Sequence, residues 1–376
     1  MLIDTLVYSD KWEIKNDTIT NKVAPGILFL FGDSDAIKSE NIYSELKTIY
    51  PNYQIVGAST AGNILGSEIN QSPAIATAVH FEKGSFKTST VDFFADEDVN
   101  TIAQRLISAL PQENLKHIFI LSDGLNINGS ELIDSANKLT KQVSITGGMA
   151  GDGDRFQETW VVSNEPAKQF RIVAVGFYGN DFVISSGCFG GWSEFGGNRI
   201  ITKSSGNVLY ELDNSPALEL YKKYLGKYAD DLPLSGMRFP LSIKQNTNSP
   251  ELIRTLLAIN EEENSVTFAG DIPEGYIACL TKPKIDLLID GAQSAAKAIY
   301  KANNNTALGL VVSCAGRKSV MNELVEDELE ILEEVLGSNV QLSGFYSYAE
   351  FAPFPSDINT CQLHNQTMTI TGIYEK

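Results

Sequence analysis

Hydrophobic and polar positions follow the same order in three separate parts of the chain: a continuous apolar run, a segment with helical spacing, and a second short apolar run. A continuous apolar run of this length predicts a strand buried on both faces. Each part therefore predicts a strand–helix–strand unit. The predicted strand, helix and strand are residues 27–31, 36–50 and 53–57 in the first unit, 117–121, 130–141 and 143–146 in the second, and 307–312, 323–336 and 340–343 in the third.

Loops rich in small residues follow the second strand of every unit, at residues 57–62, 147–153 and 344–350. Strands joined by helices predict parallel pairing, and right-handed crossovers place the loops of one unit at the same edge of a sheet. Ligands of open α/β sheets bind beyond the carboxyl ends of the strands. These loops are the candidate binding site, with ordinary tight turns as the alternative interpretation, since glycine and serine are common turn residues.

A pattern of alternating apolar and polar positions separates the second and third units. Residues 170–178, 182–186 and 199–203 predict antiparallel strands or hairpins. Residues 213–216 resemble a helix start and predict a helix over 217–225. We expect an α/β fold with mixed, largely parallel sheets built from the repeated units, together with antiparallel hairpins. The expected division is into two domains, residues 1–210 and 211–376.

The composition is that of an ordinary globular chain of 376 residues, 43% hydrophobic and 20% charged. Acidic residues outnumber basic ones by 47 to 29, which gives a net charge of −18. Such a surface repels phosphate backbones and anionic lipids, so we expect neither nucleic acid nor a membrane as a partner. No apolar run is long enough to span a bilayer, and residues 1–13 do not resemble a signal peptide. Four widely spaced cysteines predict free thiols, and together these features predict a cytoplasmic protein.

Hydroxyl groups and glycines in the first two loops suit a small anionic ligand. Ser59 and Thr60, followed by Gly62, offer hydroxyls and backbone N–H groups to a carboxylate. Gly148 and Gly151 leave room for a ligand to approach the backbone closely.

Opposite charges in the second and third units match a zwitterion. Asp152 is suited to an ammonium group, although aspartate is also a common turn former. Arg317 is suited to bidentate binding of a carboxylate, or else to pairing with the acidic helical segment behind it. A zwitterion such as an amino acid needs one group of each kind, so these loops contain the groups that such a ligand requires.

Tyr346, Tyr348 and Glu350 occupy alternating positions in the third unit. Alternating residues of an extended segment share one face. We expect them to line a polar and aromatic pocket wall, with a half-buried strand edge as the alternative.

Cys314 precedes Gly316 at an expected helix N-terminus, where the pKa of a thiol falls. A nucleophile also needs a base within hydrogen-bond reach. Of the three histidines, His117 begins a strand at the end opposite the loops, His80 lies in a strand-like run, and His364 follows a candidate hairpin. We therefore include Cys314 among the ligand-binding candidates, favour a packed thiol over a nucleophile, and assign no catalytic residue. No zinc motif or phosphate-binding loop is present, so no metal site and no cofactor are predicted.

Several of these segments resemble the FIST family. The N-terminal FIST region resembles residues 57–63 (GASTAGN), 147–152 (GGMAGD) and 159–162 (TWVV). The C-terminal FIST region resembles residues 313–317 (SCAGR), 344–348 (GFYSY) and 363–367 (LHNQT). The chain departs from the pattern at Ala349, where the family often has glycine before the glutamate.

The resemblance implies a sensory input module for a small ligand, with amino acids the usual proposal. Family members often accompany histidine kinases, chemoreceptors or cyclic-dinucleotide enzymes, and the resemblance implies such a separate output partner here. We therefore predict a cytoplasmic sensor that binds an amino acid or a similar small polar metabolite. The alternatives are a cysteine-dependent enzyme that uses Cys314 and, because some relatives are linked to haem, a haem-linked gas sensor.

Overall fold

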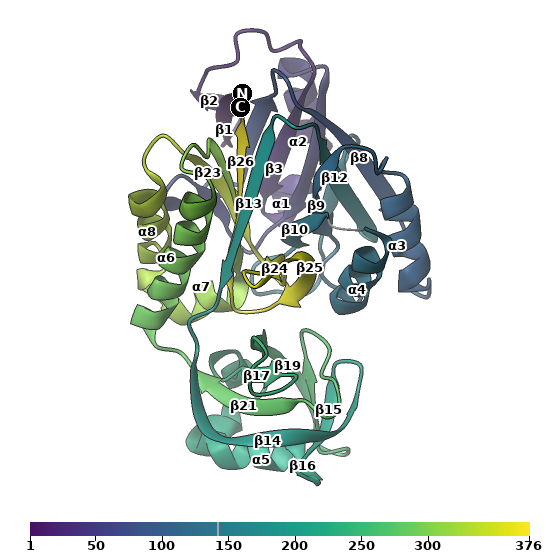
Figure 1. Cartoon of the computed structure of the whole chain (residues 1–376), viewed down its shortest axis with the longest axis vertical. Coiled ribbons are helices and arrows are strands. Elements are labelled where there is room, and N and C mark those ends of the chain that lie inside the picture. The colour runs from purple at the N-terminus through teal and green to yellow at the C-terminus, as the bar shows by residue number, and fades with distance from the viewer. Residues whose placement is uncertain (141–142) are drawn as a thin grey trace.

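A computed structural model describes residues 1–140 and 143–376. The chain forms a larger body of three six-stranded sheets and a smaller domain around one eight-stranded sheet. Figure 1 shows the small domain apart from the body, with both chain termini together at the opposite end of the body.

The body sheets are named A, B and C. Sheet A contains β1 (Leu2–Tyr8), β2 (Trp12–Asn16), β3 (Gly26–Gly32), β4 (Tyr53–Ser59), β7 (Ala74–His80) and β11 (Val161–Ser163). Sheet B contains β5 (Asn63–Leu65), β6 (Glu68–Asn70), β13 (Phe182–Phe189), β22 (Leu308–Cys314), β23 (Gln341–Ser347) and β26 (Met368–Glu375). Sheet C contains β8 (Ser85–Asp92), β9 (Leu115–Ser122), β10 (Ser144–Met149), β12 (Arg171–Tyr178), β24 (Glu350–Phe354) and β25 (Asp357–His364).

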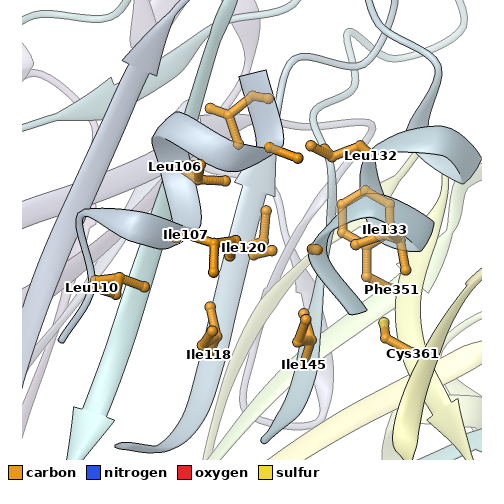
Figure 2. Packing of buried hydrophobic residues seen from close by; sticks show 14 of the residues in the cluster. Leu106, Ile107, Leu110, Ile118, Ile120, Leu132, Ile133, Ile145, Phe351 and Cys361 are labelled. Carbon is orange, nitrogen blue, oxygen red and sulfur yellow. The ribbon is translucent and has the colours of Figure 1, made fainter. Parts of the chain in front are cut away.

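Helices cover the outer faces of these sheets. The body helices are α1 (Ser34–Ile37), α2 (Glu40–Ile49), α3 (Val99–Ser108), α4 (Gly129–Leu139), α6 (Ile285–Ala302), α7 (Ala315–Met321), the 3₁₀ turn η3 (Asn322–Leu324) and α8 (Asp327–Leu336). Figure 2 shows Leu106 and Ile107 of α3, and Leu132 and Ile133 of α4, above the isoleucines of β9 and β10. On the inner side, the stacked rings of Phe31 and Phe345, 4.7 Å apart, join sheets A and B.

The small domain is inserted between β13 and α6. It contains β14 (Ser193–Ser205), β15 (Val208–Leu212), β16 (Ser215–Pro216), α5 (Ala217–Leu225), η1 (Gly226–Asp231), η2 (Leu234–Arg238), β17 (Leu241–Lys244), β18 (Leu252–Arg254), β19 (Leu256–Asn260), β20 (Ser265–Phe268) and β21 (Ile277–Lys282). Residue 210, the predicted domain boundary, lies within β15, and the division at that residue stays a prediction.

The three predicted strand–helix–strand units are confirmed. Strands β3 and β4, β9 and β10, and β22 and β23 are parallel pairs, each joined through helices. The prediction of largely parallel sheets is wrong, because these are the parallel pairs among the described strands and the other pairings are antiparallel. The sheets are mostly antiparallel because each unit is followed by a return strand, β7, β12 or β26, that runs against the first strand of its own unit.

The three units exchange strands in a closed cycle. After its second parallel strand, each unit adds a short strand to the edge of a neighbouring sheet before it returns. Strand β5 of the first unit joins sheet B, β11 of the second joins sheet A, and β24 of the third joins sheet C. The body is thus a threefold internal repeat, in which each sheet is completed by the next unit along the cycle.

One glycine recurs at the same register position of each unit. A Cβ atom on Gly57, Gly147 or Gly344 would lie 2.0, 1.9 or 1.8 Å from the carbonyl oxygen opposite it on the parallel partner strand. The oxygens belong to Leu30, Ile120 and Val311. Since any side chain would collide with backbone there, glycine is required at all three positions.

Other predicted elements differ at their ends. The expected helix over 36–50 is divided into α1 and α2, and the expected helix over 323–336 begins at Asp327. The second predicted helix ended at Lys141, which lies outside the described residues, and α4 ends at Leu139. The helix over 217–225 is confirmed as α5. Among the described residues, no helix is both long and apolar enough to cross a membrane.

Candidate functional site

The loops that follow β4, β10 and β23 interlock through a ring of backbone hydrogen bonds. Each loop donates one N–H group to the carbonyl oxygen of the next loop in the cycle. The three bonds run from Ala61 to Tyr346 at 2.8 Å, from Tyr348 to Met149 at 3.3 Å, and from Gly151 to Ser59 at 2.9 Å. The structure therefore brings the three predicted loops together at one end of the body, and we call this arrangement the loop ring.

A polar cleft of about 350 Å³ opens beside the loop ring. Three of the predicted site residues, Thr60, Gly62 and Asp152, line it. The other lining residues are Asp33, Ser34, Asp35, Ala61, Asn63, Ile69, Asn70, Gln71, Ser72, Gly153, Asp154, Arg155 and Lys318. All of them belong to the body.

Lys318 of α7 places its ammonium group against the wall of the polar cleft. Its Nζ donates to the carbonyl oxygen of Ala61 at 2.7 Å and lies 5.7 Å from the centre of the Tyr346 ring. A Cβ atom at Gly62 would lie 2.7 Å from this Nζ, so glycine leaves room for the ammonium group. Burial lowers the pKa of Lys318. No salt bridge to Lys318 forms among the described side chains, which leaves N–H donors available to a ligand.

Asp33 supplies the opposite charge in the same cleft. It directly follows β3, and its side chain makes no hydrogen bond to the N-terminus of α1. Surrounding protein raises the pKa of the Asp33 carboxyl, although Lys318 and Arg155 act in the opposite direction. The cleft thus holds a partly buried cation, Lys318, and an exposed anion, Asp33, that are not joined in an ion pair.

Asp152 organises the wall of this cleft. Its Oδ1 accepts the N–H of Phe156 at 2.9 Å and the hydroxyl of Tyr348, and its Oδ2 accepts the N–H groups of Gln157 and Glu158. The carboxylate is buried. These bonds match the turn-forming alternative, because the acceptor sites of the carboxylate are already occupied.

An apolar cleft of about 380 Å³ lies between the body and the small domain. Figure 1 shows α7, β24 and β25 at the end of the body that faces this domain. The body contributes Leu125, Gly153, Asp154, Phe156, Cys314, Ala315, Gly316, Ser319, Ser347 and Tyr348, and the small domain contributes Pro233, Leu234, Met237, Thr255, Leu256, Leu257 and Ala269. Of the predicted residues, Cys314 and Tyr348 lie here.

Arg317 is turned away from both clefts. It is fully buried, and its Nη2 forms a 2.8 Å ion pair with the buried Glu328 of α8. Its other donors bind the carbonyl oxygens of Gly190, Leu288 and Gln366. These contacts match the alternative of pairing with the acidic helix and leave no donor for a ligand.

The expectation that Tyr346, Tyr348 and Glu350 share one face is wrong. The Tyr346 hydroxyl donates to Glu328, the Tyr348 hydroxyl donates to Asp152, and Glu350 accepts from Ser347 and Thr367. The alternation fails because the chain leaves sheet B after Ser347 and enters sheet C at Glu350. Burial raises the pKa of Glu350 to about 8.

The remaining predicted residues support the loop ring from inside. Ser59 is buried, and its Oγ accepts the N–H of Trp160 at 2.9 Å. A Cβ at Gly148 would lie 2.6 Å from a methyl group of Val312, and one at Gly151 would lie 3.0 Å from the Ala61 nitrogen. These glycines allow close packing of the loops instead of close approach by a ligand.

All four thiol groups and the imidazoles of His117 and His364 are deeply buried. All four cysteines are free and buried. Burial raises the pKa of Cys314, the opposite of what an activated nucleophile requires. Burial also lowers the pKa of His117 to about 3 and that of His364 to about 4. Among residues 1–140 and 143–376, no cluster of three or more His, Cys, Asp or Glu side chains is arranged to hold a metal ion.

Sequence reasoning missed Lys318 and Asp33. The rule that ligands bind beyond strand ends applies to Asp33, which directly follows the first buried strand. Lys318 adjoins Arg317, and a helix turns its neighbouring positions by about 100°. Arg317 therefore faces the core and Lys318 reaches the polar cleft. The sequence alone does not show which of the two neighbours takes which position.

Comparison with known proteins identifies the family of the chain. The FIST N domain matches residues 26–215, and the FIST C domain matches residues 217–353. The uncharacterized protein MJ1623 of Methanocaldococcus jannaschii is 23% identical over 340 residues, which are 82% of this chain and 64% of that protein. The crystal structure of a chorismatase covers 96% of this chain and 95% of its own, with 9% identity and a TM-score of 0.33. Because the two domain matches cover most of its length, the chain belongs to the FIST family of sensory signalling domains.

Proposed function

We propose that this protein is a sensor that binds an amino acid or a similar small zwitterion in the polar cleft and signals through a separate partner. The observation that carries the proposal is Lys318, a partly buried cation without a salt bridge among the described residues, in the same cleft as Asp33. Lys318 would bind the carboxylate of the ligand, and Asp33 would bind its ammonium group. Thr60 and Asn63 add polar atoms to the same wall.

The charge balance of the cleft favours a ligand with an amino group. Asp33, Asp35, Asp152 and Asp154 line it against the two cations Arg155 and Lys318. Asp152 is occupied by its own loop, and Arg155 lies within 3.6 Å of Asp35. Lys318, Asp33 and Asp154 remain available to a ligand, and a free carboxylate without an amino group would meet more negative than positive charge.

Calorimetry with a panel of amino acids tests the proposal, with each amino acid compared with its amide and its N-acetyl derivative. We expect the zwitterion to bind at least about tenfold more tightly than either derivative, since a hydrogen bond to a charged group contributes about 1.5–3 kcal/mol. Lys318→Met and Asp33→Asn should each weaken binding by about tenfold or more. Lys222→Met is the matched control, because Lys222 pairs with Glu261 on the small domain, outside the cleft.

Two results would contradict the proposal. One is that no amino acid or related zwitterion gives a saturable heat. The other is that Lys318→Met and Asp33→Asn bind as tightly as the unchanged protein. A histidine kinase, a chemoreceptor or a cyclic-dinucleotide enzyme is the proposed recipient of the signal, and a pull-down with the ligand present and absent tests each of them.

A further inference from the structure

Large apolar side chains are exposed around the apolar cleft. Leu234 is 74% exposed, Phe156 and Leu257 are each 43% exposed, and Leu125 is 36% exposed. All four line this cleft, two from the body and two from the small domain. Contiguous exposed apolar surface around a hollow is typical of a binding site, because each side chain remains in contact with water until a ligand covers it.

The lining of the apolar cleft indicates an uncharged ligand. Its uncharged polar side chains are those of Thr255, Cys314, Ser319, Ser347 and Tyr348. In the part of the chain that the structure describes, Asp154 is the charged residue of the lining, and it also lines the polar cleft. A charged ligand would lose its hydration here without gaining a partner of opposite sign.

An aromatic pair forms one wall of the apolar cleft. The rings of Phe156 and Tyr348 stack with centroids 4.4 Å apart and planes 9° apart. Phe156 has a φ of +52°, in the left-handed region that residues other than glycine rarely adopt. The Asp152 carboxylate holds the backbone of Phe156 in this conformation by accepting its N–H. Strained residues of this kind concentrate at binding sites, and here the strain places a flat ring at the cleft.

We propose that the apolar cleft is a second binding site, for a neutral, flat aromatic small molecule. A hollow of about 380 Å³ lies in the size range of small-molecule sites. Aromatic rings prefer stacked or edge-on contact with other rings, which the Phe156–Tyr348 pair offers. The ligand would contact the body and the small domain together. This site goes beyond the polar cleft in location and in ligand chemistry.

Fluorescence titration with N-phenyl-1-naphthylamine, a neutral aromatic probe, tests the proposal with the full chain. We expect a saturable rise in emission at one probe per chain. Leu257→Glu, which places a charge in the cleft wall, should weaken probe binding at least about tenfold. Ile358→Glu is the matched control, because Ile358 is 59% exposed on β25 and does not line this cleft. Its affinity for the probe should equal that of the unchanged protein.

Further controls separate this site from the alternatives. Lys318→Met should leave probe binding unchanged, so failure of the amino-acid site and failure of this site give different results. Because Leu257 is exposed, Leu257→Glu should unfold at the same temperature as the unchanged protein. A non-saturable signal, or equal probe binding by Leu257→Glu, would overturn the proposal. A third result would also overturn it: light scattering detects a dimer of the unchanged protein, and Leu257→Glu dissociates that dimer. The exposed apolar side chains around the cleft would then be covered by a second copy of the chain.

Discussion

The polar and apolar clefts adjoin the same loop ring but differ in how their walls are held. Every wall of the polar cleft comes from the body, whose loops are tied by the ring hydrogen bonds. The apolar cleft has one wall in the body and one in the small domain, which is joined to the body by the short connections at 190–192 and 283–284. The polar cleft is therefore preformed, whereas the width of the apolar cleft depends on the position of the small domain.

Under the proposed function, this difference would separate ligand recognition from signal transmission. A charged ligand benefits from fixed partners, because a rigid site loses little entropy on binding. In the sensor that we propose, a change in the position of the small domain would be the signal to a second protein, and the apolar cleft lies where that change would occur. Arg254 and Asp271 of the small domain contact Leu363 and Asn128 of the body, so the two parts also touch beside the clefts.

Arg317→Met should have the largest effect, because it leaves the buried Glu328 without its ion-pair partner. Arg317 joins Glu328 of α8 to the carbonyl oxygens of Gly190 and Leu288, next to the two connections. Removing one partner of a buried ion pair costs about 3–5 kcal/mol. We expect a loss of that size in the free energy of unfolding, measured by urea denaturation. Lys222→Met, which breaks an exposed pair, should cost about 1 kcal/mol or less. Equal losses in the two variants would contradict this role of Arg317.

Gly344→Ala should have the next largest effect, because it disturbs the strand that carries one loop of the ring. The added methyl would lie 1.8 Å from the Val311 carbonyl oxygen, and backbone yields less easily than a side chain. Overpacking of this kind costs about 3 kcal/mol, measured by the same denaturation. Gly197→Ala meets nothing within 4 Å and should change stability by about 0.5 kcal/mol or less. If Gly57→Ala and Gly344→Ala lower the free energy of unfolding by widely different amounts, the equivalent glycines of the repeat do not contribute equally to stability.

Local patterns in the sequence predicted the strand–helix–strand units of the fold. They did not predict how strands from different units pair. Apolar runs and helical spacing identified the three strand–helix–strand units because each unit is local in sequence. The exchange of β5, β11 and β24 between sheets is not encoded locally, since each of these short strands pairs with a strand of another unit. The same exchange explains why Tyr346 and Glu350 lie in different sheets although their spacing suggests a single strand.

The sequence predicted which loops form the candidate site better than it predicted which side chains of those loops face a ligand. The glycine-rich loops lie where expected, yet Ser59, Gly148 and Gly151 hold the loops together instead of facing a ligand. Arg317 and Lys318 show why the roles of individual side chains could not be predicted. Adjacent charged residues on one short helix look equivalent in sequence, and only tertiary packing decides which one finds the buried Glu328 and which one reaches the polar cleft.

Asp152→Asn should weaken the loop that both clefts share. An asparagine Nδ2 is unable to accept the N–H groups of Gln157 and Glu158, so two partly buried donors lose their partners. We expect a loss of about 1–3 kcal/mol in the free energy of unfolding. Binding of the zwitterion and of N-phenyl-1-naphthylamine should weaken together, because residues 153–155 and Phe156 line the two clefts. Asp154→Asn, two positions away, is the control and should change stability by about 0.5 kcal/mol or less. Loss of only one binding activity in Asp152→Asn would show that the clefts do not share this support.

The pH dependence of zwitterion binding should show the smallest effect and should distinguish the polar cleft from the apolar one. Because the pKa of Asp33 is raised, its carboxyl is protonated at a higher pH than an ordinary aspartate, so affinity should fall as the pH drops through that raised pKa. Because the pKa of Lys318 is lowered, its ammonium group loses a proton at a lower pH than an ordinary lysine, so affinity should fall again as the pH rises through that lowered pKa. Calorimetry across pH should therefore give a bell-shaped profile narrower than an unperturbed Asp–Lys pair would give, with a fall of about tenfold per pH unit beyond each limit. Asp33→Asn should remove the acid limb, and probe binding in the apolar cleft, which depends on neither charge, should stay level over the same range. A profile for the zwitterion as flat as that of the neutral probe would mean that these two charges do not bind the ligand.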